Sequence, residues 1–131
     1  MNRLFYFTTV VLTLVAISTT MAGDLERPKS TVTMDQVEAT LLNGLNSQNQ
    51  GLMISSTQKL GDIHSDKAVL PLMKVLKSET DESCKIAAAL ALYNIGDKRG
   101  IYAIKKAAKF DDSEKVRSFC TKFYNEYKTQ S

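Results

Sequence analysis

A repeat of 32 residues limits the folds open to this chain more than any other feature of its sequence. Shifting the sequence by 32 positions aligns Ser65 with Asp97 and Leu60 with Leu92. Further matched pairs are Lys67 with Arg99, Val69 with Ile101, Leu72 with Ile104, Asp81 with Ser113, Glu82 with Glu114 and Lys85 with Arg117. Repeats of this length are typical of stacked pairs of helices, so we expect a helical repeat protein.

Apolar residues recur with helical spacing from residue 33 onward, and no segment alternates with a period of two. This spacing predicts helices at residues 33–45, 50–61, 66–77, 82–94, 98–109 and 114–128. Because the polar joints between them are short, consecutive helices are expected to be antiparallel neighbours. The predicted fold class is all-α: a short α-solenoid of about three helical hairpins. The hairpin units comprise about residues 33–64, 65–96 and 97–128.

The stretch AAALALYNIGDKRGIYAI, residues 87–104, contains a joint between two of these units. Gly96 can end a helix in the left-handed conformation that costs other residues more. Asp97 can then cap the next helix by accepting a hydrogen bond from its first turn. The other predicted N-cap residues are Ser65, Asp81, Ser113 and Thr33, the last in a capping box with Gln36.

Residues 66–97, DKAVLPLMKVLKSETDESCKIAAALALYNIGD, carry a recognisable pattern. A charged pair and AV..L open one helix, an acidic turn follows, and a second helix leads to IGD. This segment resembles the HEAT-like repeats of the type first described in bacterial phycobilisome lyases. Residues 98–127 match at their start and at Val116-Arg117, and GLMISSTQKLGDI is the best match in the first unit. The resemblance covers about residues 33–128 and implies HEAT-like hairpins that present surfaces to other macromolecules.

The first residues of the chain predict export. Arg3 precedes the uncharged stretch LFYFTTVVLTLVAIST, which is shorter than a membrane span and suits a secretory signal. Thr20 and Ala22 place small side chains at the −3 and −1 positions of a cleavage site after Ala22. We therefore expect a signal peptide at 1–22, a flexible leader at 23–32, a periplasmic or secreted location, and no stable membrane insertion after cleavage. An uncleaved anchor helix is the alternative.

The residue inventory disfavours catalysis and metal binding. A zinc or iron site needs several converging ligands, whereas the chain has one histidine, His64, which is expected in a solvated turn. The paired carboxylates Asp81-Glu82 and Asp111-Asp112 could suggest general acid–base catalysis. Both pairs occupy the same turn of consecutive repeats, where capping explains them better. The expectation is a protein that is not an enzyme, with no catalytic residue, metal or cofactor.

Two cysteines, Cys84 and Cys120, lie on equivalent helices of adjacent units, offset by one helical turn. An exported compartment permits a disulfide between them. A bridge needs Cα atoms within about 7 Å, whereas stacked helices lie about 10 Å apart. The other interpretation is two small buried residues, because Cys84 aligns with Val116 and Cys120 with Ala88.

The formal net charge of +3 carries little information, but its distribution is uneven. One predicted helix holds the basic residues Lys98, Arg99, Lys105, Lys106 and Lys109. This cluster is either a solvated helix face or a binding surface for an acidic protein or polysaccharide. Nucleic acid is not expected as a partner because the chain is predicted to be exported.

The last predicted helix is unusually aromatic, with Phe119, Phe123, Tyr124 and Tyr127. These side chains occupy more of the helix circumference than one buried face requires. Large rings can close the core where no further unit follows, or they can form a docking surface for a partner or a second copy.

The predicted function is therefore a non-catalytic protein–protein interaction module, an adaptor or scaffold. The candidate partner-binding residues are those of the basic and aromatic clusters. The alternative is a structural protein that assembles into homo-oligomers by joining copies through its aromatic last helix.

Overall fold

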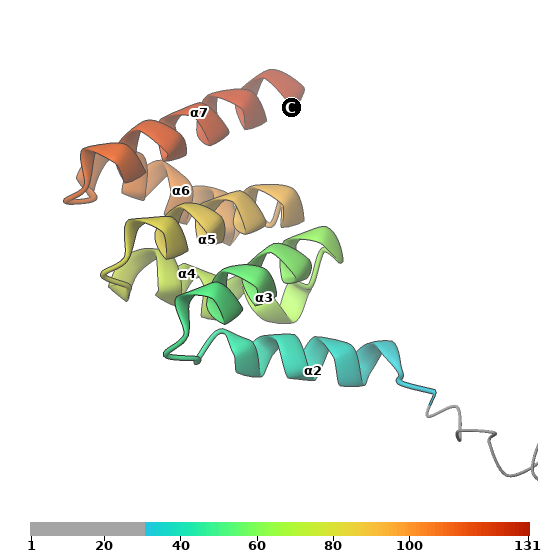
Figure 1. Ribbon diagram of the computed structural model, residues 1–131. Helices are drawn as coiled ribbons and strands as arrows, with labels where there is room; N and C mark the ends of the chain where they lie inside the picture. Colours follow the sequence, from blue (N-terminus) through green and yellow to red (C-terminus); the bar gives the residue numbers. More distant parts are fainter. Residues whose placement is uncertain (1–30) are drawn as a thin grey trace, which may run out of the picture. The chain divides into compact units, whose positions relative to one another are not determined.

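Helices account for all regular secondary structure in the computed structural model, which describes residues 31–131 (Figure 1). The elements are α2 (Met34–Gly44), α3 (Gln50–Asp62), the 3-10 helix η1 (Asp66–Ala68), α4 (Val69–Ser78), α5 (Glu82–Ile95), α6 (Lys98–Phe110) and α7 (Glu114–Gln130). The predicted all-α class is confirmed, and five of the six expected helices begin and end within two residues of their predicted bounds. The predicted signal peptide and residues 23–30 of the predicted leader lie outside the described residues.

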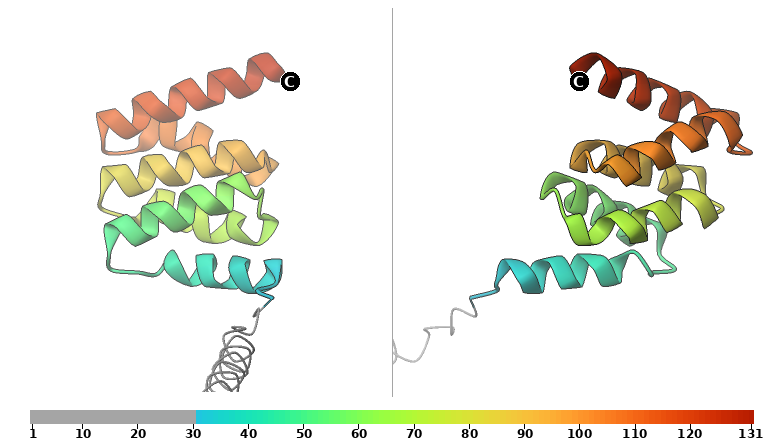
Figure 2. Two further views of the ribbon diagram at one scale, coloured as in Figure 1. Left: turned by 45° about the vertical axis from the view of Figure 1, so that its right-hand side comes forward. Right: turned by 180° about the vertical axis from the view of Figure 1, so that it is seen from behind.

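The helices form two layers of a helical repeat (Figure 2). One layer consists of α3, α5 and α7, in which each helix packs on the next. The other layer contains α4 and α6, which pack side by side and each contact their own hairpin partner, α5 or α7. Helix α2 packs on α3 and completes the first hairpin. None of the described helices is both long enough and apolar enough to cross a membrane.

The core between the layers is built from repeated positions. Leu60 and Leu92, which the repeat aligns, are both fully buried, and so are Leu72 and Ile104. Burying each such side chain contributes roughly 1.5–3 kcal/mol. The inner faces predicted from the apolar pattern are therefore the faces that pack.

Small residues let the helices of the α3–α5–α7 layer approach closely. A Cβ atom added to Gly61 would lie 2.9 Å from the Cα of Ala91, so any side chain there would force α3 away from α5. The small-residue stretch of α5 thus serves backbone contact between hairpins, which bulkier residues would prevent.

Every predicted N-cap is confirmed. Thr33 and Gln36 form the expected capping box, and the side chains of Ser65, Asp97 and Ser113 accept hydrogen bonds from backbone N–H groups in their helices' first turns. Asp81 accepts from the N–H of Cys84, and this hydrogen bond lowers the pKa of its carboxyl group. Asn49 caps α3 in the same way and was not predicted. The caps fix where each repeat begins.

The joint after α5 has the predicted conformation, since Gly96 adopts a left-handed φ of 75°. His64 occupies the equivalent position after α3 and also has a positive φ, 51°. Its exposed ring forms a hydrogen bond of 2.8 Å between Nδ1 and the carbonyl oxygen of Asn94. His64 therefore lies in an exposed turn, as expected, and also links the first two hairpins.

One predicted helix differs from the structure. Residues 66–77 were expected to form a single α-helix, but Asp66–Ala68 form a 3-10 turn and α4 starts only at Val69. Pro71 has no N–H to donate to the carbonyl of Lys67, and its ring crowds that oxygen. The residues before Pro71 therefore take the tighter turn.

Candidate functional site

A groove of about 580 Å³ lies between α4 and α6, on the layer away from α3. Its inner wall is mainly apolar and is formed by Met73, Leu76, Ala103 and Ala107. Each of these side chains also belongs to the core or packs against it. The groove is therefore a fixed feature of the packing between two repeats, and such concave apolar surfaces are common binding sites.

Three large apolar side chains line the groove and are exposed. Leu70 on α4 is 61% exposed, and Tyr102 and Phe110 on α6 are 65% and 74% exposed. Leu70 and Tyr102 occupy equivalent repeat positions, where the first hairpin has Glu38. A single exposed apolar residue is ordinary, but three around one groove indicate an interaction surface.

Basic side chains line both sides of this groove, with Lys74 and Lys77 on α4 and Lys106 on α6. Helices α4 and α6 contain seven basic residues and no acidic residue: Lys74, Lys77, Lys98, Arg99, Lys105, Lys106 and Lys109. Arg99 is held by Asp97 through two hydrogen bonds of 3.0 Å, which lower the pKa of the carboxyl group. The six lysines are exposed, and within residues 31–131 none of them forms an ion pair with a carboxylate. The positive charge of the three that line the groove, Lys74, Lys77 and Lys106, is therefore available to a partner.

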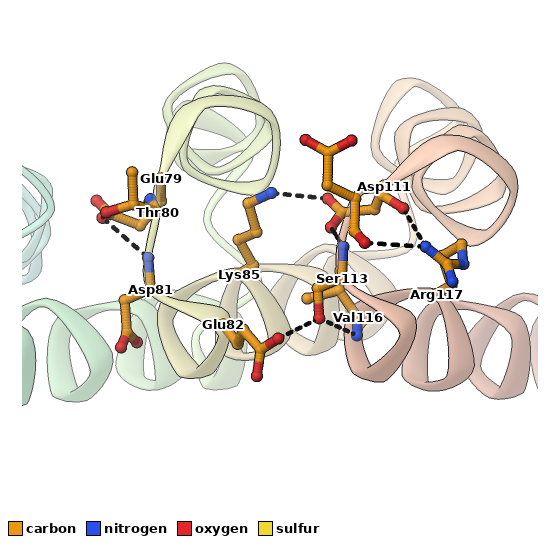
Figure 3. Close-up of polar contacts among 10 residues, drawn as sticks. Glu79, Thr80, Asp81, Glu82, Lys85, Asp111, Ser113, Val116 and Arg117 are labelled. Atoms are coloured by element: carbon orange, nitrogen blue, oxygen red, sulfur yellow. Dashed lines mark hydrogen bonds and ion pairs between the residues drawn. The ribbon is translucent and has the colours of Figure 1, made fainter.

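A buried ion pair closes one end of the groove. Lys85 of α5 reaches the turn between α6 and α7, where its Nζ lies 2.8 Å from Oδ2 of Asp111 (Figure 3). The two side chains are only 13% and 6% exposed, and both line the groove. Asp111 also accepts a hydrogen bond from the backbone N–H of Ser113. The pair ties the second hairpin to the third at the site.

The same turn is braced by further polar contacts. The hydroxyl of Ser113 donates to the carboxylate of Glu82 and accepts from the N–H of Val116 (Figure 3). Arg117 stands at the repeat position of Lys85 but donates to the backbone carbonyls of Asp111 and Asp112. The first two hairpins have a comparable link, because Ser65 and Lys67 both donate to Glu38 and thereby lower the pKa of its carboxyl group.

The aromatic residues of α7 are all half-buried. Phe123 stacks on Tyr93 of α5 with ring centroids 5.9 Å apart, and Phe119 is tilted against Phe123. Tyr124 lies beneath the ammonium groups of Lys105 and Lys128. Phe123, Tyr124 and Tyr127 pack against the core. These contacts favour core closure, and docking through α7 stays a prediction.

Cys84 and Cys120 are free and buried, so the structure does not contain the disulfide considered from the sequence. Cys84 lies beside the first hairpin, where it lines a second cavity of about 490 Å³ with Leu45 and Met53. Cys120 packs in the core one helical turn further along its helix. The interpretation as two small buried residues fits the structure.

Both thiols are expected to resist alkylation in the folded protein. Burial raises the pKa of Cys84 to about 11 and of Cys120 to about 12. Since an unfolded thiol has a pKa of about 8.5, the unfolded state loses these protons first, and the free energy of unfolding falls as pH rises above about 9. Mass spectrometry after iodoacetamide treatment should show no adduct at neutral pH and two in denaturant without reductant. A native adduct, or fewer than two in denaturant, would contradict this assignment.

Within the described part of the chain, no three His, Cys, Asp or Glu side chains are grouped so that they could hold a metal ion. His64, Asp81 and Asp111 lie in turns, where His64 and Asp111 link neighbouring hairpins and Asp81 caps α5. Their side-chain contacts are those of structural residues.

The predicted basic residues and the groove coincide only in part. Lys106 lines the groove, and Lys98, Lys105 and Lys109 are exposed on the same helix. The three exposed apolar residues of the groove, Leu70, Tyr102 and Phe110, were not among the residues predicted from the sequence. Tyr102 and Phe110 lie on the lysine side of α6, opposite its buried Ile104, so helical periodicity could have singled them out.

The family model for HEAT repeats matches residues 38–121, which include most of the described helices and the whole groove. A search of curated proteins found no match.

Proposed function

The chain belongs to the HEAT-repeat family, whose members are generally protein-interaction scaffolds, and we propose that it binds a partner protein without catalysis through the α4–α6 groove. The observation that carries this proposal is the exposure of Leu70, Tyr102 and Phe110 around an apolar groove that has exposed lysines on both sides. A folded protein gains nothing in stability from leaving such side chains in water. A partner that covers them gains roughly 25 cal/mol for each Å² of apolar surface removed from water.

The groove suits an adaptor because its position is fixed by packing. The Lys85–Asp111 pair holds the two hairpins together at one end of the groove, and buried Leu76 supports its inner wall. A preformed surface loses little conformational entropy on binding. The lysines attract acidic partners over a distance of about 10 Å at ordinary salt concentrations.

The proposed setting is the periplasm or the cell exterior. Support for it comes from the sequence of residues 1–22, with its basic start, uncharged apolar stretch and small residues before position 23. Detection of the chain beginning at Gly23 in an extracellular or periplasmic fraction is the expected result. Retention of Met1 there would contradict cleavage.

Self-assembly through α7 has less support. In the structure, Lys85 pairs with Asp111 of the following hairpin. The residue of the first hairpin equivalent to Asp111 is Ser47, because 111 − 64 = 47. A second copy stacked head-to-tail on α7 would therefore offer Arg117 a serine in place of a carboxylate.

Replacing both Tyr102 and Phe110 by serine is expected to lower partner recovery about tenfold or more, as loss of aromatic anchors does. Both side chains are exposed, so the variant should keep its fold. The measurement is affinity purification of tagged protein from its native cell envelope, with quantitative mass spectrometry.

The matched control is Leu52→Ser, which removes a large apolar side chain 52% exposed on α3, away from the groove. Wild type and this control should recover the same partner in equal amounts. If circular dichroism shows that the Tyr102→Ser/Phe110→Ser variant is folded, equal recovery by this variant would contradict partner binding through the groove.

A further inference from the structure

We infer that the occupant of the α4–α6 groove is an amphipathic α-helix with acidic flanks, supplied by another protein. The inference rests on the proposed function, because it requires that the groove is the binding face. It adds the conformation and the charge of the bound segment, and each follows from a separate property of the groove.

The chemistry of the inner wall favours a helix. Met73, Leu76, Ala103 and Ala107 offer no side-chain hydrogen-bond partners to a segment lying against them. An extended peptide would leave backbone N–H and C=O groups unpaired on this apolar wall, and burying such groups is costly. A helix satisfies these groups internally and presents only side chains.

The spacing of the exposed residues also fits a helix. Tyr102 and Phe110 are eight residues apart on α6, which corresponds to about 12 Å along the helix axis. Between them, Ala103 and Ala107 have short side chains and leave room in the groove. A bound helix can fill this length with apolar residues at positions i, i+3 or i+4, and i+7.

Acidic flanks follow from the charge of the two walls. Lys74 and Lys77 lie on the α4 side of the groove, and Lys106 lies on the α6 side. Since all three lack a carboxylate partner within residues 31–131, a helix seated between them meets positive charge on both sides of its apolar stripe. Asp112 lines the end of the groove beyond Phe110, so the acidic residues of the partner should avoid that end.

A membrane surface and nucleic acid fit less well. A flat bilayer would contact the exposed rim but leave the apolar inner wall uncovered. Phosphates of a nucleic acid would contact the lysines, but these charged groups would not pack against the apolar wall formed by Leu76, Ala103 and Ala107. Only a segment with both acidic and apolar faces uses the whole groove.

The test measures binding of synthetic peptides to the purified protein by fluorescence anisotropy. The probe is a peptide of about 18 residues, or five helical turns, with a leucine stripe and glutamates on both flanks. One comparison peptide has two central residues replaced by proline, and another has lysine in place of glutamate. Vesicles of phosphatidylcholine and phosphatidylglycerol in equal amounts are tested in parallel.

The acidic helical peptide is expected to bind with a Kd on the order of 10 µM, weaken as salt increases, and gain helicity in circular dichroism. The proline and lysine peptides should bind about tenfold more weakly or not at all. Lys106→Glu and Tyr102→Ser/Phe110→Ser should each weaken binding about tenfold. Lys122→Glu, which makes the same charge change on α7, should leave binding unchanged.

Equal binding of the proline peptide would overturn the helical occupant. If vesicles bind through Tyr102 and Phe110 and the peptides do not bind, the occupant of the groove is a membrane surface and not a helix. If the peptides fail but affinity purification still recovers a protein through Tyr102 and Phe110, this inference fails and the proposed function stands. If that recovery is also independent of the groove, both fail.

Discussion

Replacement of Lys85 by methionine is expected to lower the free energy of unfolding by about 3 kcal/mol, the cost of removing one partner from a buried ion pair. The variant would leave the carboxylate of Asp111, only 6% exposed, without its cation. The hydrogen bond from the N–H of Ser113 would stay but compensates only in part. Because this pair joins two hairpins, the loss should appear as a lower midpoint of urea denaturation.

The matched control is Arg117→Met, which changes the equivalent basic residue of the next hairpin. Arg117 donates to the backbone carbonyls of Asp111 and Asp112, which lie within its own hairpin. Its removal should cost less than the loss of Lys85, about 1.5 kcal/mol, the lower end of the range for hydrogen bonds made by a charged group. Equal destabilisation by the two variants would contradict the view that Lys85 is a link between repeats.

Replacement of Leu92 by alanine is expected to cost about 3 kcal/mol, within the range for buried leucines. Leu92 is fully buried in the core cluster of α5. Its side chain packs over the start of α6, where a Cβ added to Gly100 would lie 2.9 Å from its Cδ2 atom. Alanine lacks the side-chain atoms that pack on α6, so the substitution would leave a cavity between α5 and α6.

Leu90 of the same helix provides the control. It is 37% exposed, and its change to alanine should cost less than about 1 kcal/mol. Both variants are compared with wild type by urea denaturation followed by circular dichroism. Comparable losses for Leu90→Ala and Leu92→Ala would mean that the repeat positions do not define the core.

The sequence predicted the fold well where local chemistry and repetition agree. The Ser65 and Asp97 caps, the left-handed Gly96 and the buried Leu60 and Leu92 all follow from residue types at positions 32 apart. The predicted start of the helix at residue 66 was wrong, because Pro71 favours a 3-10 turn in the residues before it and α4 begins only at Val69. The repeat also did not indicate that His64 would adopt the positive φ that Gly96 has at the equivalent position of the next unit.

The groove was harder to predict because it depends on how two helices pack. Periodicity places Tyr102 and Phe110 on the polar side of α6, but only the structure shows that Leu70 lines the same groove from α4. The role of the aromatic residues of α7 also depends on packing. Their number left core closure and a docking surface both open, and in the structure Phe123 and Tyr124 are partly covered by contacts with Tyr93 and Lys105. A helix with few neighbours needs large side chains to complete its packing.

Photo-crosslinking from single positions in native cells tests the binding face most directly. A benzophenone amino acid is placed at position 102 or 70 in the groove, or at Gln58 or Lys122 on exposed sites of α3 and α7. Positions 102 and 70 should give one discrete adduct with the same protein, and positions 58 and 122 should give none. Adducts formed only from 58 or 122, or adducts only with a second copy of this chain, would contradict partner binding through the α4–α6 groove.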